Sequence, residues 1–402
     1  MDAARARAEQ FAIGAAVTVD ELAGDPHRVL ARLRAREPVS WLPALAGWLV
    51  TRRDLATQVM RDPQAFTVDD PRFSTGQVVG ASMLTRDGEE HRRHRAPFAE
   101  PFRRGAVHAR FARLVEAETD RLIDAIAPAG EAELRLDLAG PLAVGVVTRA
   151  LGIQDADPAT VLGWYERIVA AVTDITAGRP AGAAGREAYA ELAAAIDPAL
   201  DREPAASLLA AAAGHAGGLA RERIISNAAV LLFGGIETTE GMIANAVWHL
   251  LSHPDQVALV GGSPDALANA IEESLRLEPA AAIVDRYATA DVEIGGAPVA
   301  RGDLVRVSIA GANRDPAEFA QPDRFDVLRS NADRHLAFAH GPHACIAMHL
   351  ARLEARTAVD RLLARLPDLR LDPARPTAPR GLVFRKPPEL HVQWDRVAIV
   401  AA

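Results

Sequence analysis

The residues around the single cysteine carry the strongest chemical signal in this chain of 402 residues. Cys345 lies in the segment FAHGPHACIA, residues 338–347, with Phe338 seven positions before it, Gly341 four before and His343 two before. A glycine permits a tight backbone turn, and N–H groups in such a turn favour a thiolate over a thiol. With an aromatic ring beside the sulfur, this thiolate could serve as a ligand to a haem iron.

Two other interpretations of this cysteine have to be weighed. A lone cysteine in an intracellular protein is commonly a small, buried and unreactive side chain. Imidazole and thiolate are also the usual ligands of zinc, and four such groups occur close together in the sequence: His340, His343, Cys345 and His349. The zinc interpretation gives no role to Phe338 or Gly341, so the spacing favours haem.

A second unusual segment is GGIETT, residues 234–239, at the centre of a long helical pattern over residues 221–252. Each glycine inside a helix costs ~1 kcal/mol relative to alanine. Such a concentration of poor helix formers indicates either a helix that is locally opened for function or close packing of two helices at the glycines.

Two further pairs of residues place charges one helical turn apart. Glu273 and Arg276 have the spacing that puts an acid and a base on one helix face. Alone, such a pair is typical of an exposed contact worth ~0–1 kcal/mol. His91 and Arg95 also share a helix face, although the basic run of residues 91–95 could equally be a solvated surface.

Together these segments resemble the cytochrome P450 family. The pattern F-x-x-G-x-H-x-C is similar to the family's haem loop, GGIETT to its acid–alcohol motif, and E-x-x-R lies between them as in the family. The resemblance covers most of the chain. It implies a mainly α fold with minor β, a single-domain cytochrome P450 fold over residues 1–402. Haem b would be the cofactor, with the Cys345 thiolate as its axial ligand.

The resemblance also implies roles for matched residues near the haem. Glu237 and Thr238 match the acid and the alcohol that supply the protons consumed in dioxygen cleavage. Gly234 matches a position that leaves room for oxygen and water, and Phe338 the aromatic residue that covers the sulfur. Haem propionates need cationic partners, and the residues at the family's propionate-binding positions are His91, Arg95, Arg286 and His343.

A structural network is implied as well, and two positions depart from the family pattern. Glu273 and Arg276 match residues that hold the haem loop, and Arg324 in the segment PDRF matches the arginine that completes this network. Ala347 stands where the family usually has glycine two residues after the cysteine, and the extra methyl could alter the packing of helix and haem. Glu237 stands where aspartate is common, a change that should preserve proton transfer.

The resemblance places a substrate pocket in four segments of mostly small or apolar residues. These are a loop over residues 78–83, a roofing helix over 164–173, a stretch beside the haem over 281–284 and a late turn over 382–384. The pocket candidates are Val79, Met83, Ile283 and Phe384. Such a lining favours a small hydrophobic or aromatic substrate.

The function that the resemblance implies is a monooxygenase reaction driven by two external electrons, with bacterial secondary metabolism as a suggested context. A ferredoxin and a ferredoxin reductase would supply the electrons, and Arg92, Arg93 and Arg352 could contact an acidic partner. Three alternatives keep the haem–thiolate site but change the chemistry: oxidative coupling, nitration and peroxide-driven oxidation. A non-catalytic binding protein on the same fold is a further alternative, although it would need neither Cys345 nor the Glu237–Thr238 pair.

Composition limits the binding partners and the cellular location that we expect for this protein. The net charge of −8 disfavours nucleic acid as a partner, and no stretch approaches the ~20 apolar residues of a membrane span. A single cysteine fits a reducing compartment, so we expect a cytoplasmic protein without membrane attachment. The sequence has no heptad pattern, which favours a monomer. Lys386 is the only lysine, which we attribute to codon bias rather than to chemistry.

Periodicity predicts the elements that must position these residues. Helical patterns extend over residues 110–127, 221–252, 264–277 and 349–366. Short strand patterns cover residues 48–51, 292–294, 304–307 and 390–394. This balance agrees with a mainly helical domain that has small sheets.

Overall fold

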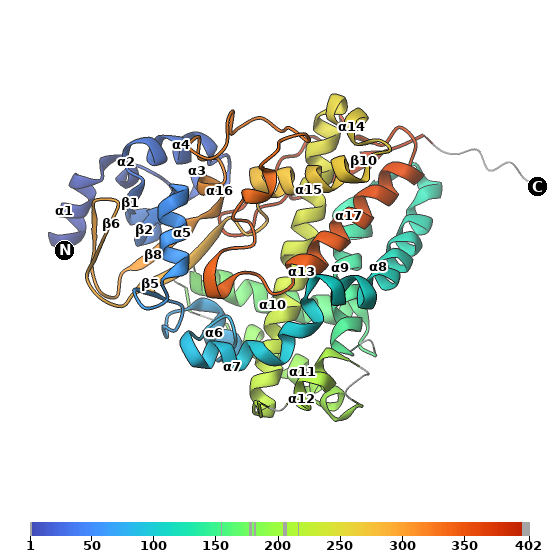
Figure 1. Cartoon of the computed structure of the whole chain (residues 1–402), viewed down its shortest axis with the longest axis horizontal. Helices are drawn as coiled ribbons and strands as arrows, with labels where there is room; N and C mark the ends of the chain where they lie inside the picture. The colour runs from blue at the N-terminus through green and yellow to red at the C-terminus, as the bar shows by residue number, and fades with distance from the viewer. Residues whose placement is uncertain are drawn as a thin grey trace, which may run out of the picture.

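The computed structural model describes residues 2–153, 155–176, 179–180, 182–203, 207–215 and 217–395. Helices make up most of the described chain, and the sheets gather at one end of the molecule (Figure 1). This arrangement confirms the expected class, mainly α with minor β. The domain bounds of residues 1–402 stay a prediction, because residue 1 and residues 396–402 lie outside the described residues.

The helices before the longest one cover the first half of the chain. They are α1 (Asp2–Gln10), α2 (Ala12–Ala15), α3 (Val19–Ala23), α4 (His27–Arg36), α5 (Arg53–Arg61), α6 (Ser74–Val79), α7 (Gly88–Ala99), α8 (Arg104–Ile126), α9 (Gly140–Leu151), α10 (Pro158–Thr176), α11 (Ala183–Ile196) and α12 (Leu208–Ala213). The later helices are α13 (Arg221–Ser252), α14 (Pro254–Val260), α15 (Pro264–Leu277), α16 (Ile309–Ala312) and α17 (Met348–Arg365).

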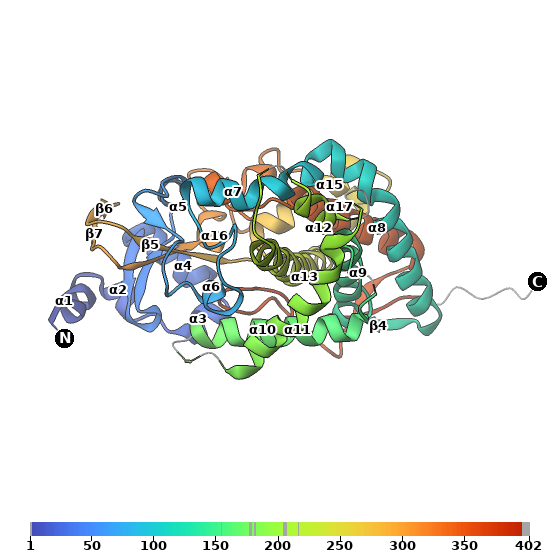
Figure 2. The same cartoon turned by 90° about the horizontal axis from the view of Figure 1, so that it is seen from below.

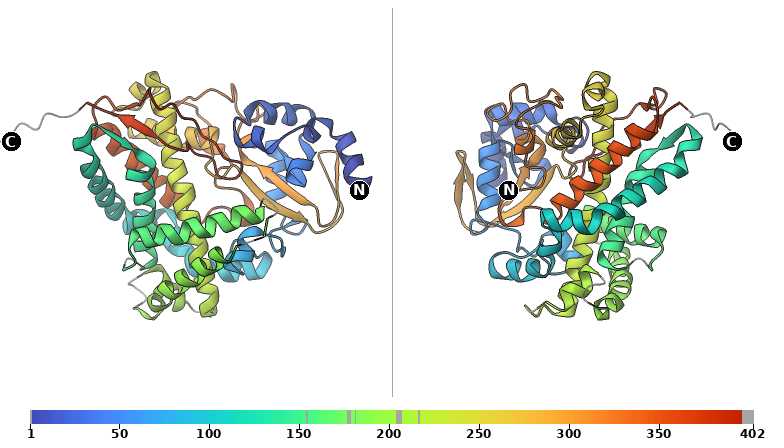
Figure 3. Two further views of the ribbon diagram at one scale, coloured as in Figure 1. Left: turned by 180° about the vertical axis from the view of Figure 1, so that it is seen from behind. Right: turned by 45° about the vertical axis from the view of Figure 1, so that its right-hand side comes forward.

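Three small sheets accompany the helices. The five-stranded sheet has the order β1 (Val39–Leu42), β2 (Gly47–Val50), β8 (Leu304–Ser308), β5 (Ile283–Ala288) and β3 (Phe66–Thr67), with β2 and β8 parallel and the other neighbours antiparallel. A second sheet joins β4 (Glu131–Glu133), β10 (His391–Gln393) and β9 (Arg370–Leu371). The strands β6 (Val292–Ile294) and β7 (Ala297–Val299) form a hairpin. Figure 3 shows β10 near the C-terminal end of the described chain, beside β4.

The elements predicted from periodicity are present. The helix over 221–252 and the helix over 264–277 begin and end where predicted, and the others differ by one to six residues at an end. The second of these helices is well delimited in sequence, because Ser263 accepts a hydrogen bond from the backbone N–H of Ala266 and Pro264 follows at the first helical position. A serine cap and a proline are start signals that a sequence shows directly.

Helix α13 runs through the centre of the molecule, and the other helices pack around it. Figure 2, a view along its axis, shows it surrounded by α9, α10, α12 and α17. Most of its side chains are buried, and its apolar ones join the largest apolar cluster of the protein. Two smaller clusters pack on the five-stranded sheet. Because α13 is buried on nearly all sides, its polar residues need specific partners.

The described chain contains no helix that is both long and apolar enough to cross a lipid bilayer.

Candidate functional site

The loop that carries Cys345 is fixed by its backbone. We call residues 338–347 the thiolate loop; its centre is a 3₁₀ turn over Gly341–His343, and the N–H of Cys345 donates to the carbonyl of Phe338 at 2.8 Å. Gly341 has φ of +74°, and a Cβ there would lie 2.4 Å from the carbonyl oxygen of Met60 in α5. The glycine is therefore required both for the turn and for the close approach of α5.

The electrostatics of Cys345 depend on burial. Burial raises the pKa of the Cys345 thiol, while the backbone N–H of Ala347 and the guanidinium groups of Arg95 and Arg352 act in the opposite direction. The balance favours the protonated thiol, so the expectation that the turn alone holds a thiolate is too simple. A coordinated metal cation would displace the proton, as it does for cysteine ligands in general.

A central cavity of about 270 Å³ lies between this loop and α13. Cys345, Phe338 and Ala347 line one wall, and Gly234 and Thr238 line the wall formed by α13. Its surface is mostly apolar, with side chains such as Leu231 and Phe102. The structure thus brings together the two motifs that lie about a hundred residues apart in the sequence.

The expected local opening of α13 is not present, because Arg221–Ser252 forms one continuous helix. Gly234 and Gly235 occupy their positions in the helix for different structural reasons. A Cβ at Gly235 would lie 3.2 Å from Cγ2 of Val147 in α9, so this glycine permits close helix packing. A Cβ at Gly234 would meet no described atom within 4 Å, which leaves open space on the cavity side. Close helix packing is therefore the reason for Gly235, whereas Gly234 leaves space beside the cavity without any opening of the helix.

Thr238 and Glu237 lie on different faces of α13. The hydroxyl of Thr238, which faces the cavity, donates to the carbonyl of Gly234 at 2.6 Å. Glu237 is buried beside the C-terminal segment, by which we mean residues 372–390 between β9 and β10. Its carboxylate lies 3.0 Å from Nζ of Lys386 in this segment. Adjacent residues in a helix are ~100° apart around the axis, and Thr238 lines the cavity whereas Glu237 does not.

Two of the four predicted propionate-binding residues line the cavity. They are Arg95 in α7, whose Nη2 donates to the carbonyl of Ala344 at 2.7 Å, and His343. The ring of His91 is buried behind His343, with the two ring centroids 4.3 Å apart. Nε2 of His91 is buried without a hydrogen-bond partner among the described residues. Arg286 in β5 is also buried, and its Nη1 donates to the carbonyl of Asp285.

An unpredicted carboxylate joins this cluster. Asp87, the residue before α7, lies 2.8 Å from Nε2 of His343. Burial favours the neutral form of Asp87, but hydrogen bonds from His343, Thr67 and the backbone of Val68 outweigh it and lower the pKa of Asp87 to about 2. Sequence reasoning did not single out Asp87, although an acid directly before a helix is a visible signal; its side chain does not cap α7 but pairs with His343.

The pKa of His91 is lowered to about 4, first by burial and then by the nearby charges of His343 and Arg95. A propionate placed beside these cations would supply the missing negative charge and favour the protonated ring. The unpartnered Nε2 of His91 and the cations on the cavity wall therefore fit an acidic group of a cofactor.

The predicted network below the site exists, with one correction. Arg276 donates to Glu273 through Nε at 2.7 Å and Nη2 at 2.8 Å, and both side chains are fully buried. The second arginine on Glu273 is Arg329, with Nε 2.9 Å from Oε1. The prediction of Arg324 was wrong: its side chain is exposed, and only its carbonyl takes part, as an acceptor from Arg276 and Arg329.

Arg352 has a positioning role that sequence reasoning missed. It makes a bidentate ion pair with Glu272 at 2.7 Å, and its guanidinium lies 4.4 Å from the centroid of the Phe338 ring. These contacts tie α17 to α15 and to the thiolate loop. The side chain is 26% exposed, so it is largely committed within the protein rather than free to meet a partner.

Of the predicted pocket residues, Met83 lines the cavity and the others pack behind it. Val284 lines the cavity, and because side chains alternate along a strand, Ile283 points to the opposite face of β5, into a small apolar cluster. Val79 is buried in the main core. The ring of Phe384 contacts Phe233, a cavity residue, with centroids 5.7 Å apart.

The expected roofing helix lies behind the cavity wall: no residue of 164–173 lines the cavity, and the ring of Tyr165 lies 6.4 Å from that of Phe233, which does. Residues 164–173 lie within α10, where Trp164 donates from Nε1 to Glu191 of α11 at 2.8 Å. The cavity wall is instead completed by residues that sequence reasoning did not single out, among them Val147 and Leu208. Helical periodicity identifies such side chains as buried but does not distinguish a cavity wall from a core.

The zinc interpretation is not supported by the geometry. Among the described residues, no group of three or more histidine, cysteine, aspartate or glutamate side chains is placed to hold a metal ion. His340, His343, Cys345 and His349 therefore do not converge on one point.

A haem fits the central cavity on several independent observations. The thiol lies on one wall, the cations lie at one edge, and the α13 wall is open at Gly234. Ala347 has φ of −95° and ψ of 14°, a conformation that alanine adopts without left-handed strain. The departure from the usual glycine is therefore compatible with the backbone of the loop.

Known proteins resemble this chain over nearly its full length. The cytochrome P450 family model matches residues 266–391. Cytochrome P450 monooxygenase PikC of Streptomyces venezuelae is 36% identical over 94% of this chain and 92% of the relative. The 6-deoxyerythronolide B hydroxylase of Saccharopolyspora erythraea is 32% identical over 86% of this chain and 88% of the relative. The solved structure of CalO2 has a TM-score of 0.85 at 30% identity and covers 94% of this chain and 99% of that chain.

The matches agree with the architecture described above. Relatives above 30% identity extend across both the helical part and the sheets, so the similarity is that of the whole fold and not of one motif. The matched region of the family model contains the buried Glu273–Arg276 pair and the thiolate loop. This chain therefore belongs to the cytochrome P450 family and is an oxidoreductase of the monooxygenase type.

Proposed function

We propose that the chain binds haem b through the thiolate of Cys345 and oxidises a small hydrophobic substrate. The observation that carries this proposal is the central cavity, which has Cys345 on one wall and Thr238 on the other. For a hydroxylation the balance is RH + O₂ + 2e⁻ + 2H⁺ → ROH + H₂O. When bound, haem supplies the iron centre at which dioxygen is reduced and one oxygen atom reaches the substrate.

The side chains of the chain have separate tasks in this reaction. Cys345 would hold the iron, while Arg95, His343 and the buried His91 would hold the propionates. The hydroxyl of Thr238 donates to the carbonyl of Gly234 and can accept a hydrogen bond from water in the cavity, so it is placed to pass on a proton. Glu237 would supply protons from the neighbouring face of α13.

The lining of the cavity supports a hydrophobic substrate. Apolar side chains from several helices dominate the wall, and the charged or titratable members gather near the thiolate loop. Such a wall offers shape and apolar contact rather than ionic anchors. The relatives named above include, by name, a 6-deoxyerythronolide B hydroxylase, and we propose bacterial secondary metabolism as the context.

Electrons would come from a separate protein, for which we propose a ferredoxin with its reductase. The exposed Arg92 and Arg93 of α7 support this proposal, although each is paired with a glutamate one turn earlier in the helix. We therefore expect a modest contribution to docking from each. Charge reversal at both positions should slow reduction by the ferredoxin and leave reduction by dithionite unchanged. If the ferredoxin reduces the variant as fast as the wild type, Arg92 and Arg93 are not part of the docking surface.

A monomer and a cytoplasmic location complete the proposal. The monomer rests on the sequence, which has no heptad pattern. The location rests on the single cysteine, which must stay reduced to serve as a ligand.

The haem–thiolate assignment is tested by the absorption spectrum of the reduced protein with carbon monoxide. We expect the far-red-shifted Soret band of a thiolate ligand for the wild type and its loss in Cys345→His, with the propionate residues unchanged. A wild-type band at the position typical of histidine or thiol ligation would contradict the assignment.

The proton role of Thr238 separates oxygen activation from peroxide-driven chemistry, coupling and nitration. In Thr238→Ala we expect less product per electron pair and more hydrogen peroxide, because the hydroxyl on the cavity wall is lost. Thr238→Ser retains a hydroxyl and serves as the matched control. If Thr238→Ala and the wild type give the same amount of product per electron pair, Thr238 has no part in the mechanism and the alternative reactions are favoured.

A further inference from the structure

The only lysine of the chain lies against the carboxylate of the acid–alcohol pair. Nζ of Lys386 is 3.0 Å from Oε1 of Glu237 and 3.1 Å from Oε2 of Glu240. The lysine side chain is 15% exposed and both carboxylates are 9% exposed. Apart from histidine, every other cationic side chain of the chain is an arginine, and the ion pairs of this single ammonium group give it a chemical setting that codon bias does not explain.

The surrounding charges form a closed set. Glu237 and Glu240 are three positions apart on α13 and share a face, where like charges repel. Arg135, in a short π-helical turn, donates from Nε to Oε1 of Glu240 at 2.7 Å. Two acids thus meet two cations in a largely buried place, and the pairing compensates part of the cost of removing the charges from water. Lys386 is the member that touches both acids.

The backbone fixes where the ammonium group lies. Residues Arg380 and Lys386 are paired as an antiparallel bridge, and the indole N–H of Trp248 in α13 donates to the carbonyl of Thr377 at 2.8 Å. The segment packs directly on α13, since a Cβ at Gly241 would lie 3.6 Å from Cβ of Lys386, at van der Waals contact. The C-terminal segment is thereby held against the helix that carries the acid.

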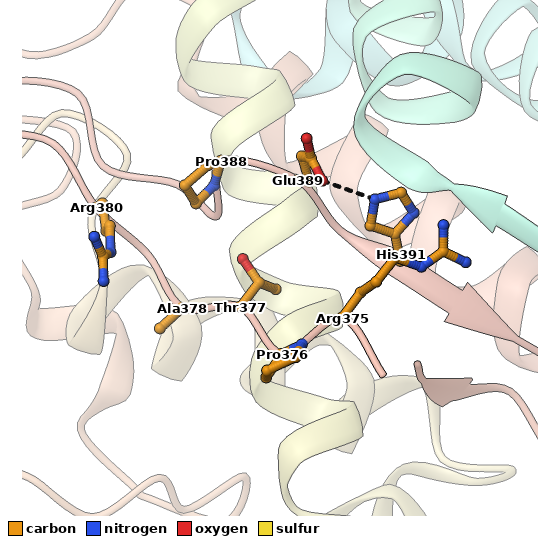
Figure 4. Close-up of a pocket in the computed structure, with 8 residues that line it drawn as sticks. All are labelled: Arg375, Pro376, Thr377, Ala378, Arg380, Pro388, Glu389 and His391. Atoms are coloured by element: carbon orange, nitrogen blue, oxygen red, sulfur yellow. Dashed lines mark hydrogen bonds and ion pairs between the residues drawn. The ribbon is translucent and has the colours of Figure 1, made fainter. Parts of the chain in front are cut away.

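The same segment forms a hollow on the protein surface. We call it the surface hollow; it has a volume of about 590 Å³ and is lined by residues of the stretches 375–380 and 388–391. Figure 4 shows these residues with a helix ribbon behind them, and His391 paired with Glu389. Arg135 donates to the carbonyl of Pro388, a residue of the hollow, so the charge cluster borders it.

We propose that Lys386 is a positioning residue that holds the Glu237 carboxylate at the outer end of the proton supply, in the charge cluster that borders the surface hollow. This inference rests on the proposed proton role of Glu237 and Thr238. Thr238 faces the central cavity, whereas Glu237 is turned toward Lys386. The ammonium group is shared between two acids and its contact with Glu237 is to Oε1, so we assign the exchange of a proton with water to Oε2.

The contact itself can be tested by NMR, since a chain with one lysine that is grown with [ε-¹³C]lysine gives one side-chain signal. We expect Glu237→Gln and Glu240→Gln each to move this signal in the haem-loaded protein. Arg370→Met is the control, because Arg370 in β9 is 51% exposed and pairs with Asp395. If the chemical shift of the lysine signal is the same in both glutamine variants as in the wild type, the proposal is refuted.

The functional consequence is tested by Lys386→Met, with Lys386→Arg as the variant that keeps the charge. We expect Lys386→Met to keep the haem content and the carbon monoxide band of the wild type. It should lower product per electron pair by about threefold or more, a small part of the ~10²–10⁴-fold effect of positioned proton transfer. Lys386→Arg should recover part of this loss, and Arg370→Met should match the wild type.

The outcomes distinguish this inference from the function beneath it. If Thr238→Ala and Glu237→Gln lower the product per electron pair while Lys386→Met does not, the role of Lys386 is refuted and the proposed function stands. If neither Thr238→Ala nor Glu237→Gln loses coupling, the proton relay itself is refuted. Should Lys386→Met fail to bind haem, the NMR experiment and Lys386→Arg still decide, because unchanged coupling in Lys386→Arg together with an unresponsive lysine signal would overturn the proposal.

Discussion

The buried network on α15 offers a sharp comparison between two arginines five residues apart. We predict that Arg329→Ala strongly destabilises the protein, whereas Arg324→Ala does not. The guanidinium of Arg329 contacts both carboxylate oxygens of Glu273, at 2.9 and 3.1 Å, and also donates to the carbonyls of residues 320, 321 and 324. Arg324 is exposed and contributes a carbonyl that alanine retains.

The magnitude follows from what remains around Glu273. Breaking a buried ion pair by removing one partner costs about 3–5 kcal/mol. In Arg329→Ala, Glu273 still has the fork of Arg276 and the backbone N–H of Asp326 at 3.1 Å. We therefore expect the lower end, about 3 kcal/mol, which is roughly a 100-fold rise in the unfolded population. For Arg324→Ala we expect a change within about 0.5 kcal/mol, as for other exposed positions.

The assay is denaturant unfolding of the haem-loaded variants, with equal haem content at the start and the carbon monoxide spectrum as a second measurement. Arg329→Lys is the matched control: it keeps the charge but lacks the planar fork, so its stability should fall between Arg329→Ala and the wild type. Because Arg276 and Arg329 tie down the chain that precedes the thiolate loop, Arg329→Ala should also lose the thiolate band more readily. If Arg324→Ala were as damaging as Arg329→Ala, the reasoning would be refuted.

Three other predictions concern the loop and the buried titratable groups. Gly341→Ala should prevent stable haem retention, measured by haem content after purification, because its Cβ would lie 2.4 Å from the carbonyl oxygen of Met60. Burial raises the pKa of Glu354 well above its usual value, so its stabilising contribution is present below about pH 4.5 and is lost as pH rises through the folded pKa. Between the unfolded and the folded pKa, the stability of Glu354→Gln relative to the wild type should therefore rise with pH, by about 1.4 kcal/mol per pH unit. Unfolding curves at several pH values measure this difference. Burial lowers the pKa of His249 to about 3, so its contribution is present above about pH 6.5 and is lost as pH falls toward 3. His249→Phe should reduce that acid-side loss in the same measurement.

The parts of the structure that could be predicted from sequence are those with local signals. The helices over Arg221–Ser252 and Pro264–Leu277 have clear periodicity and clear ends, and their bounds were correct. The thiolate loop was predicted from a pattern in which each residue type has a steric or chemical reason. Gly341 illustrates this, since a positive φ and the approach of another helix both exclude a side chain.

The parts that could not be predicted depend on the path of the chain in space. Arg324 and Arg329 lie in one irregular segment, and sequence gives no rule for which guanidinium turns inward. Ile283 and Val284 are equally apolar, and only the pairing of β5 decides which one meets the cavity. Periodicity has no information on such choices, because each is settled by contacts between residues that are distant in sequence.

The acid and the alcohol of α13 show why a long-range contact is needed at this site. Two adjacent residues in a helix point ~100° apart, and in α13 the cavity is lined by Thr238 and Thr239 but not by Glu237. Thr238 occupies the cavity face together with Gly234, one turn earlier, and Glu237 is left on another face. A buried carboxylate there needs a cation, and α13 has none within a turn of it. The C-terminal segment supplies Lys386 at that point, which makes a contact across about 150 residues part of the same proton supply as the neighbouring threonine.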